Sequence, residues 1–166
     1  MSELLRNPSI MHKVQTKVRQ VISTKSTIDE TDIHSLHFLK MVIKETLRLH
    51  PPAPWMLPME NRKQYPKYWK EPKTFNLDRF INKSVDYRGL DFEYIPFGAG
   101  RRICPGITFG LANIELPLSS LLYHFDWKLV NVGMKNQDLD MTESFGVSVK
   151  RKSVLKLVPT IVRPPA

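Results

Sequence analysis

The amino-acid sequence predicts a mainly α-helical fold with a few short β-strands near the C-terminal end, an α+β class. Two segments, at about 9–22 and 36–49, place apolar residues at intervals of three and four, the period of an amphipathic helix. A third segment, at about 106–124, is apolar at most positions. From about 125 to 160 the pattern changes to short alternating runs, which favour strands. The length of 166 residues is that of one domain, residues 1–166.

The first predicted helix, 9–22, separates an apolar face from a basic one. The apolar residues are Ile10, Met11, Val14, Val18, Val21 and Ile22. Asn7-Pro8 interrupts any helix before it, and residues 2–6 are interpreted as the end of a preceding helix. On this interpretation the chain begins within a larger fold. Residues 23–35 are polar and rich in turn and capping residues, so they predict a connection.

The second predicted helix, 36–49, ends at His50-Pro51-Pro52, because proline cannot continue a helix. Glu45 and Arg48 are three residues apart and therefore share one face of this helix. Taken alone, the pair would be an exposed ion pair worth about 0.2–0.5 kcal/mol. The aromatic and proline-rich residues at about 65–81 predict an irregular segment.

The segment 97–106 contains the single cysteine of the chain, Cys104. Gly98 and Gly100 allow a positive φ or a close backbone approach. Pro105 is favoured at the first position of a helix, so Cys104 is expected at a helix N-terminus, where the helix dipole favours an anion such as a thiolate. We therefore expect a buried thiolate that binds a metal. The alternative is a buried cysteine that packs as a small apolar residue.

The predicted helix at 106–124 is apolar on nearly every side, which indicates burial all round, and Pro117 inside it is expected to kink it. Residues 125–129, 147–149 and 155–158 alternate, and the basic residues 150–152 are expected to form the turn of a hairpin.

The net charge of +9 comes from lysines and arginines scattered along the chain. This pattern predicts a solvated basic surface or a docking face for an acidic protein, and it argues against nucleic-acid binding. Dinucleotide, phosphate-loop and serine-hydrolase motifs do not occur. One cysteine and the His34–His37 pair supply too few ligands for a zinc site. No apolar run reaches the roughly eighteen residues that span a membrane.

The pattern Phe-x-x-Gly-x-Arg-x-Cys-x-Gly, formed by Phe97, Gly100, Arg102, Cys104 and Gly106, resembles the haem-binding loop of the cytochrome P-450 superfamily. The resemblance implies haem b (iron protoporphyrin IX) as cofactor, with the Cys104 thiolate as the iron ligand. It also implies that Arg102 meets a propionate, that Phe97 lies against the sulfur, and that Gly106 lets the following helix pass close to the macrocycle. Gly98 completes this expected cofactor-binding loop.

Glu45-x-x-Arg48 before Leu-His-Pro-Pro resembles a second mark of the family. The resemblance implies a buried structural triad whose third member is Arg79, within Phe75–Phe80. The family form at this place is Pro-Glu-Arg-Phe, so Leu77 and Asp78 depart from it.

Residues 43–52 and 109–115 are similar to the plant microsomal type of the family, which oxidises terpenoids, alkaloids and related hydrophobic molecules in plant secondary metabolism. The implied function is a haem-thiolate monooxygenase, an oxidoreductase that accepts electrons from NADPH–cytochrome P-450 reductase. The implied location is the cytosolic face of the endoplasmic reticulum membrane, although a chain without the anchor could be cytoplasmic. Pro52–Trp55 would line the substrate side.

The resemblance covers only the C-terminal part of that fold. We expect the membrane anchor, the N-terminal sheet and the oxygen-activating helix to lie outside this chain. We also expect an internal deletion after Pro58, where Met59 replaces a basic residue and a hairpin is missing. The alternative function is therefore a truncated, catalytically silent fragment that binds haem or the reductase.

Overall fold

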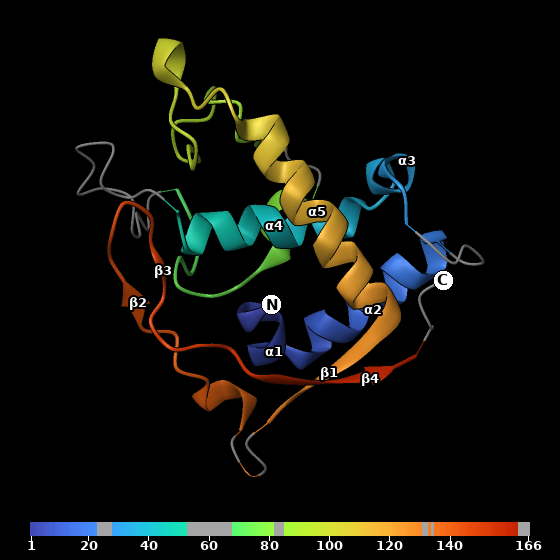
Figure 1. The fold of residues 1–166 in the computed structure, drawn as a ribbon. Coiled ribbons are helices and arrows are strands. Elements are labelled where there is room, and N and C mark those ends of the chain that lie inside the picture. Colours follow the sequence, from blue (N-terminus) through green and yellow to red (C-terminus); the bar gives the residue numbers. More distant parts are fainter. Residues whose placement is uncertain (23–27, 53–67, 82–84, 131–132, 134, 163–166) are drawn as a thin grey trace. The chain divides into compact units, whose positions relative to one another are not determined.

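The computed structural model describes residues 1–22, 28–52, 68–81, 85–130, 133 and 135–162. These residues are mainly helical with two small sheets, so the predicted fold class is confirmed (Figure 1). The helices are α1 (Ser2–Arg6), α2 (Pro8–Ile22), α3 (Glu30–His34), α4 (His37–Leu49) and α5 (Ile107–His124). The strands are β1 (Phe125–Leu129), β2 (Glu143–Ser144), β3 (Lys150–Arg151) and β4 (Leu157–Ile161), and the 3-10 turns are η1 (Leu77–Phe80), η2 (Gly100–Arg102) and η3 (Asn136–Asp138).

The chain divides into two compact units. The first contains Met1–Lys40, Phe109–Met141 and Ser153–Ala166, and the second contains Met41–Thr108 and Thr142–Lys152. The boundary between the units falls within two helices: α4 begins in the first unit and ends in the second, and α5 begins in the second unit and ends in the first. The second unit holds Cys104 and every residue of the expected triad.

In the first unit, α2 begins directly after Asn7, whose carbonyl accepts from the N–H groups of Ile10 and Met11 at 3.0 Å. The apolar face predicted for this helix is buried, apart from Ile10, which is half-buried, and Val21, which is exposed. The polar connection at 23–35 contains a short helix that its composition did not predict. That helix, α3, begins with a capping box: the side chains of Asp29 and Asp32 each accept a hydrogen bond from the backbone N–H of the other residue.

Helix α5 ends against α2 through a basic side chain. Arg19 donates to the carbonyl oxygens of Tyr123 and Phe125, both at 3.2 Å, and to the Asp126 carboxylate at 2.9 Å. Gln15 donates to Phe125 and Asp126 as well, at 3.0 and 3.1 Å. The last carbonyls of a helix have no partner within it, so Arg19 caps the end of α5 at Tyr123 and opposes the negative end of its dipole. The remaining bonds hold the first two residues of β1.

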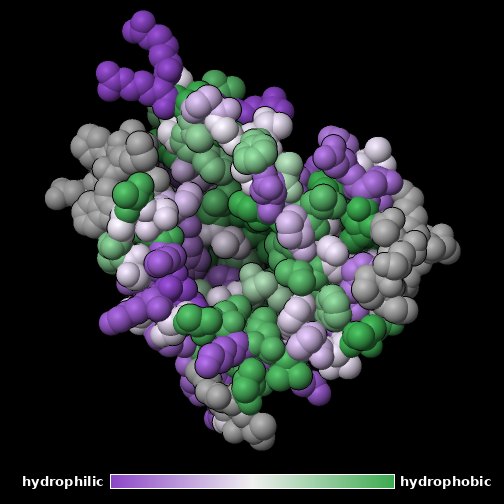
Figure 2. All heavy atoms as spheres, in the orientation of Figure 1, coloured by the Kyte–Doolittle hydropathy of each residue, from purple (hydrophilic) through white to green (hydrophobic). Residues whose placement is uncertain are grey.

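The prediction that α5 is buried on every side is wrong. Its C-terminal half is buried at Leu122 and Tyr123, but Phe109 is 77% exposed and Ile114 is also exposed. An apolar composition marks a surface suited to burial, but burial also requires a second surface. Among the described residues such a surface covers Leu111 and much of the C-terminal half of α5, and it leaves Phe109 and Ile114 exposed. Other large apolar side chains are exposed as well, and Figure 2 shows apolar groups reaching the surface of the face it displays; the most exposed are Leu90, Phe92, Val147 and Val154.

The strand pairing differs from the expected hairpin. Strand β1 pairs antiparallel with β4, from Phe125 opposite Ile161 to Leu129 opposite Leu157. Lys150 and Arg151, expected in a turn, form β3 and pair with β2, while residues 147–149 lie in the connection between these two strands. Alternation in the sequence indicates an extended backbone but not its partner, which explains both errors. Within the described residues, every helix falls short of the length and apolarity that crossing a membrane requires.

Candidate functional site

Helix α4 carries a buried carboxylate that holds one arginine of its own helix. Glu45 is completely buried, and its two oxygens accept from Arg48 Nε at 2.7 Å and from Arg48 Nη2 at 2.9 Å. The pair is therefore bidentate and shielded from water, unlike the exposed pair that spacing alone suggested. A charge pair in such a place persists only when both groups are fully hydrogen-bonded.

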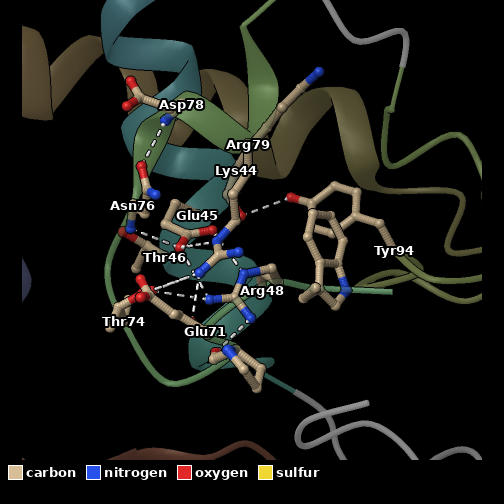
Figure 3. Close-up of polar contacts among 12 residues, drawn as sticks. Lys44, Glu45, Thr46, Arg48, Glu71, Thr74, Asn76, Asp78, Arg79 and Tyr94 are labelled. Carbon is tan, nitrogen blue, oxygen red and sulfur yellow. Dashed lines mark hydrogen bonds and ion pairs between the residues drawn. The ribbon is translucent and has the colours of Figure 1, made fainter. Parts of the chain in front are cut away.

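A second arginine reaches the same carboxylate from η1. Arg79, which is 7% exposed, places Nε 3.2 Å from Glu45 Oε1, and the backbone N–H of Asn76 donates to that oxygen at 2.9 Å (Figure 3). The structure thus brings Glu45, Arg48 and Arg79 together as one cluster. The carboxylate accepts four hydrogen bonds, three of them from guanidinium groups.

The remaining N–H groups of the two arginines bind the backbone of residues 70–74. Arg48 donates to the carbonyls of Pro72 at 2.8 Å and Thr74 at 3.2 Å. Arg79 donates to the carbonyl of Lys70, to that of Glu71 at 2.6 Å and to the Thr74 hydroxyl at 3.1 Å. An irregular segment lacks the internal partners of a helix or strand, so these donors satisfy its carbonyl groups. Glu71, at a φ of 50°, is held in the left-handed region that non-glycine residues seldom adopt.

An aromatic cluster packs beside the arginines. The Trp69 ring lies 5.4 Å from the Arg48 guanidinium and 5.9 Å from that of Arg79, within the range of cation–π attraction. Trp69, Phe80 and Tyr94 form the buried core of this part of the unit. The Tyr94 hydroxyl donates to the Lys44 carbonyl at 2.9 Å, and burial raises the pKa of Tyr94 far above its usual value, with further help from the nearby Tyr87 and Asp86.

The cysteine loop, residues 97–106, is closed by its own backbone. Cys104 N–H donates to the Phe97 carbonyl at 2.9 Å, and Ile103 N–H donates to the Gly100 carbonyl at 3.1 Å. Gly98 and Gly100 have φ values of 81° and 65°, so both need the conformational freedom of glycine. The thiol of Cys104 is exposed, which corrects the expectation of a buried sulfur. The hydrogen bond draws the Cys104 backbone toward Phe97, while the sulfur remains accessible.

Helix α5 begins at Ile107, so Pro105 and Gly106 form a turn before it and Pro105 is not its first residue. A Cβ atom on Gly106 would lie 3.8 Å from the Cys104 sulfur, in contact with it. Glycine therefore keeps the space beside the sulfur open. Arg101 and Arg102, in η2, are exposed.

The residues around Cys104 suit a metal ion whose other ligands come from a bound cofactor and not from protein side chains. Among the described residues, no group of three or more His, Cys, Asp or Glu side chains is placed to hold a metal ion. One accessible sulfur can serve as the single protein ligand of a porphyrin iron. The glycine beside the sulfur and the exposed Arg102 fit a flat ring that carries acidic groups at its edge. The residues present therefore fit a haem.

Sequence reasoning missed three contributors to this region: Lys44, Trp69 and Asn76. Trp69 carried the only usable signal, an aromatic residue in an irregular segment. Of the expected substrate-side residues, Pro52 is described, whereas 53–55 lie outside the described residues, as do Pro58, Met59 and residues 65–67.

A family model described as cytochrome P450 matches the chain in two stretches, residues 1–65 and 56–156. Among curated proteins, the chain is 51% identical to cytochrome P450 71D10 of Glycine max over 182 residues, covering 96% of this chain and 36% of that protein. It is 50% identical to tabersonine 16-hydroxylase 2 of Catharanthus roseus, with the same coverage. It is 49% identical to premnaspirodiene oxygenase of Hyoscyamus muticus, covering 99% of this chain and 37% of that protein.

The chain thus spans little more than a third of the length of these relatives. The aligned stretch of 182 residues is longer than the chain of 166, so the relatives carry extra residues within it. The two family matches meet and overlap at residues 56–65. Both observations agree with the internal deletion expected after Pro58.

Proposed function

The chain belongs to the cytochrome P450 family, and from this premise we propose that it forms the haem-thiolate part of a monooxygenase. The reaction is the insertion of one oxygen atom from O₂ into a hydrophobic small molecule. The observation that carries the proposal is the accessible sulfur of Cys104, presented by a glycine-turned loop directly before α5.

Each residue of the loop has a role in this proposal. When bound, haem b would supply the redox chemistry of oxygen insertion, with Cys104 as the protein ligand of its iron. The N–H of Cys104 donates to the Phe97 carbonyl and so anchors the backbone that carries the sulfur. Gly106 leaves room beside the sulfur for the ring, and Arg102 offers its charge to a propionate. Gly98 and Gly100 set the backbone turns that make this arrangement possible.

The triad supports the core next to this loop and takes no part in the chemistry. Glu45, Arg48 and Arg79 hold the irregular segment 70–76 against α4, and the aromatic core beside them extends to Tyr94, three residues before Phe97. We propose these three as structural residues, so their removal should affect folding before it affects electron transfer.

Substrate, partner and location follow the family. The names of two relatives, a tabersonine 16-hydroxylase and a premnaspirodiene oxygenase, support a hydrophobic substrate such as an alkaloid or a terpenoid. The partner is NADPH–cytochrome P450 reductase, and the location is the cytosolic face of the endoplasmic reticulum membrane. The net charge of +9 supports docking to an acidic partner, and such docking should weaken steeply as salt is added. A flat salt response would contradict it.

The coverage of 36% of the relatives' length favours a second candidate for the polypeptide of 166 residues taken by itself. In this candidate the polypeptide binds haem or the reductase without turnover. The two candidates differ in one measurable property, reductase-dependent oxygenation with this chain as the sole haem protein.

The test of haem ligation is the reduced carbon monoxide difference spectrum of the purified chain after addition of haem. Ligation by Cys104 predicts a thiolate-type Soret band that Cys104→Ser abolishes. The matched control is Ser119→Ala, which alters a buried hydroxyl of α5 in the other unit and should leave the band intact. An unchanged spectrum in Cys104→Ser would overturn the proposal.

A further inference from the structure

The segment Val85–Asp91, named here the buttress, lies against the cysteine loop at two points. The Tyr87 ring meets the Phe97 ring edge-on, with centroids 5.9 Å apart. Gly89 has a φ of 79°, and a Cβ atom built on it would approach Ala99 Cα to 2.9 Å and Gly98 O to 3.1 Å. The backbone of the buttress is therefore packed directly on the backbone that bends before Cys104.

Lys44 of α4 holds the buttress in place. Its Nζ donates to the Val85 carbonyl at 2.9 Å and lies 3.4 Å from Asp86 Oδ1. The same ammonium lies 5.7 Å from the centroid of the Tyr87 ring and 5.8 Å from that of Phe80. Asp86 in turn accepts from Tyr87 N–H at 2.8 Å, which ties the ion pair to the ring that meets Phe97.

The path from Lys44 to Cys104 is therefore short, with three successive contacts. Lys44 fixes Tyr87, Tyr87 packs on Phe97, and the Phe97 carbonyl accepts the Cys104 N–H at 2.9 Å. Two consecutive residues of α4 therefore hold two different segments: Lys44 binds the buttress, and Glu45 binds the irregular segment 70–76.

We propose that Lys44 is a positioning residue for Cys104, acting through the buttress on the backbone that aims the sulfur. The inference deepens the proposed function, because it assigns a residue that sets the direction of the expected iron ligand. It concerns a contact within this chain and can therefore be measured without haem.

The experiment is amide hydrogen exchange followed by NMR on the 166-residue chain without haem, in Lys44→Met, which keeps most of the length of the side chain and removes its charge. A cation–π contact and a charge-assisted hydrogen bond are lost together, so we expect the Cys104 amide to exchange about tenfold faster. Amides in α2, in the other unit, should keep their rates. Lys44→Arg, which retains the cation, should restore most of the protection at Cys104.

Lys40→Met is the matched control, because Lys40 lies on the same helix and donates to the His34 carbonyl instead, at 3.3 Å. It should leave Cys104 unchanged. Equal acceleration in α2 and at Cys104 would indicate general destabilisation and overturn the proposal, as would an unchanged Cys104 rate in Lys44→Met. Should Lys44→Met fail to fold, Tyr87→Leu removes the middle contact and must raise the Cys104 rate in the same selective way.

Haem titration of the same variants separates this inference from the proposed function. Lys44→Met should reduce the thiolate-type fraction of the bound pigment, and Lys44→Arg should restore it. If the wild-type chain binds no haem through Cys104 while the exchange effect is present, the positioning role stands and the proposed function falls. If the wild-type chain binds haem through Cys104 but the exchange rate of the Cys104 amide is the same in Lys44→Met, the positioning role is refuted and the proposed function stands.

Discussion

Replacing Glu45 by glutamine tests how much the buried cluster contributes to stability. The carboxylate is fully buried and accepts four hydrogen bonds, so the amide would place an NH₂ group against guanidinium or backbone N–H donors. It would also leave two buried arginines without their shared counter-charge. Removing one partner of a buried ionic cluster costs about 3–5 kcal/mol, which is a fifth or more of the total stability of a typical domain, about 5–15 kcal/mol.

The assay is urea unfolding followed by circular dichroism, with tryptophan fluorescence as a second signal because the Trp69 ring lies against both arginines. Glu3→Gln is the matched control, since Glu3 also pairs with an arginine three residues later, at 3.7 Å and with the Arg6 side chain partly exposed. Glu3 is itself buried, but it pairs with one arginine instead of two and at a longer distance, so the Glu3 substitution should cost less than the Glu45 substitution. If Glu45→Gln costs no more than Glu3→Gln, the reasoning from burial and hydrogen bonding is refuted.

Three further predictions concern other parts of the chain. Gly100→Ala should destabilise the fold by about 1–2 kcal/mol, because alanine must adopt the φ of 65°. Gly110→Ala, inside α5 with open space around it, should stabilise the fold by about 1 kcal/mol. The midpoints of thermal unfolding compare the two variants, and equal shifts would contradict the argument. Arg19→Met should cost about 1–3 kcal/mol in urea unfolding, because charged hydrogen bonds to the α5 terminus are lost, and a value within error of Lys17→Met would contradict this. Partial burial raises the pKa of Glu115 above its usual 4.5, and the nearby Lys40 and His34 oppose this shift without cancelling it. In acid the carboxyl is protonated in both the folded and the unfolded chain, and the stability it contributes is fully present. That stability is lost as the pH rises through the raised folded-state pKa. Glu115→Gln should therefore gain stability relative to the wild type from acid toward neutral pH, and parallel curves of urea midpoint against pH would count against the assignment.

The helices could be predicted from the sequence because their period is local. Helices α2 and α4 occupy residues that repeat apolar side chains every three or four positions. A proline is the first residue of α2, and Pro51 follows the end of α4. Helix α3, with five residues, is too short for such a repeat, and its capping box reads equally well as a turn. Strand pairing failed because β1 finds its partner in β4, far along the chain, and no local feature names that partner.

The site could be predicted in its parts but not in its connections. The motif around Cys104 identified the loop, and the positive φ values of its two glycines agree with the freedom expected of them. The surroundings of Glu45 depend on residues distant in sequence, Asn76 and Arg79, which a local pattern on α4 does not reveal. Lys44 looked like one more basic residue on a helix, because the carbonyl and the rings that it contacts lie about forty residues or more away in most cases.

The arginines grip residues 70–74 almost entirely by main-chain oxygens, and this has an evolutionary consequence. Every amino acid supplies the same carbonyl group. The exposed side chains of this stretch, among them Lys70 and Lys73, can therefore be substituted without losing the hydrogen bonds to the arginines. Variation should accumulate there, while Glu45, Arg48 and Arg79 tolerate almost none.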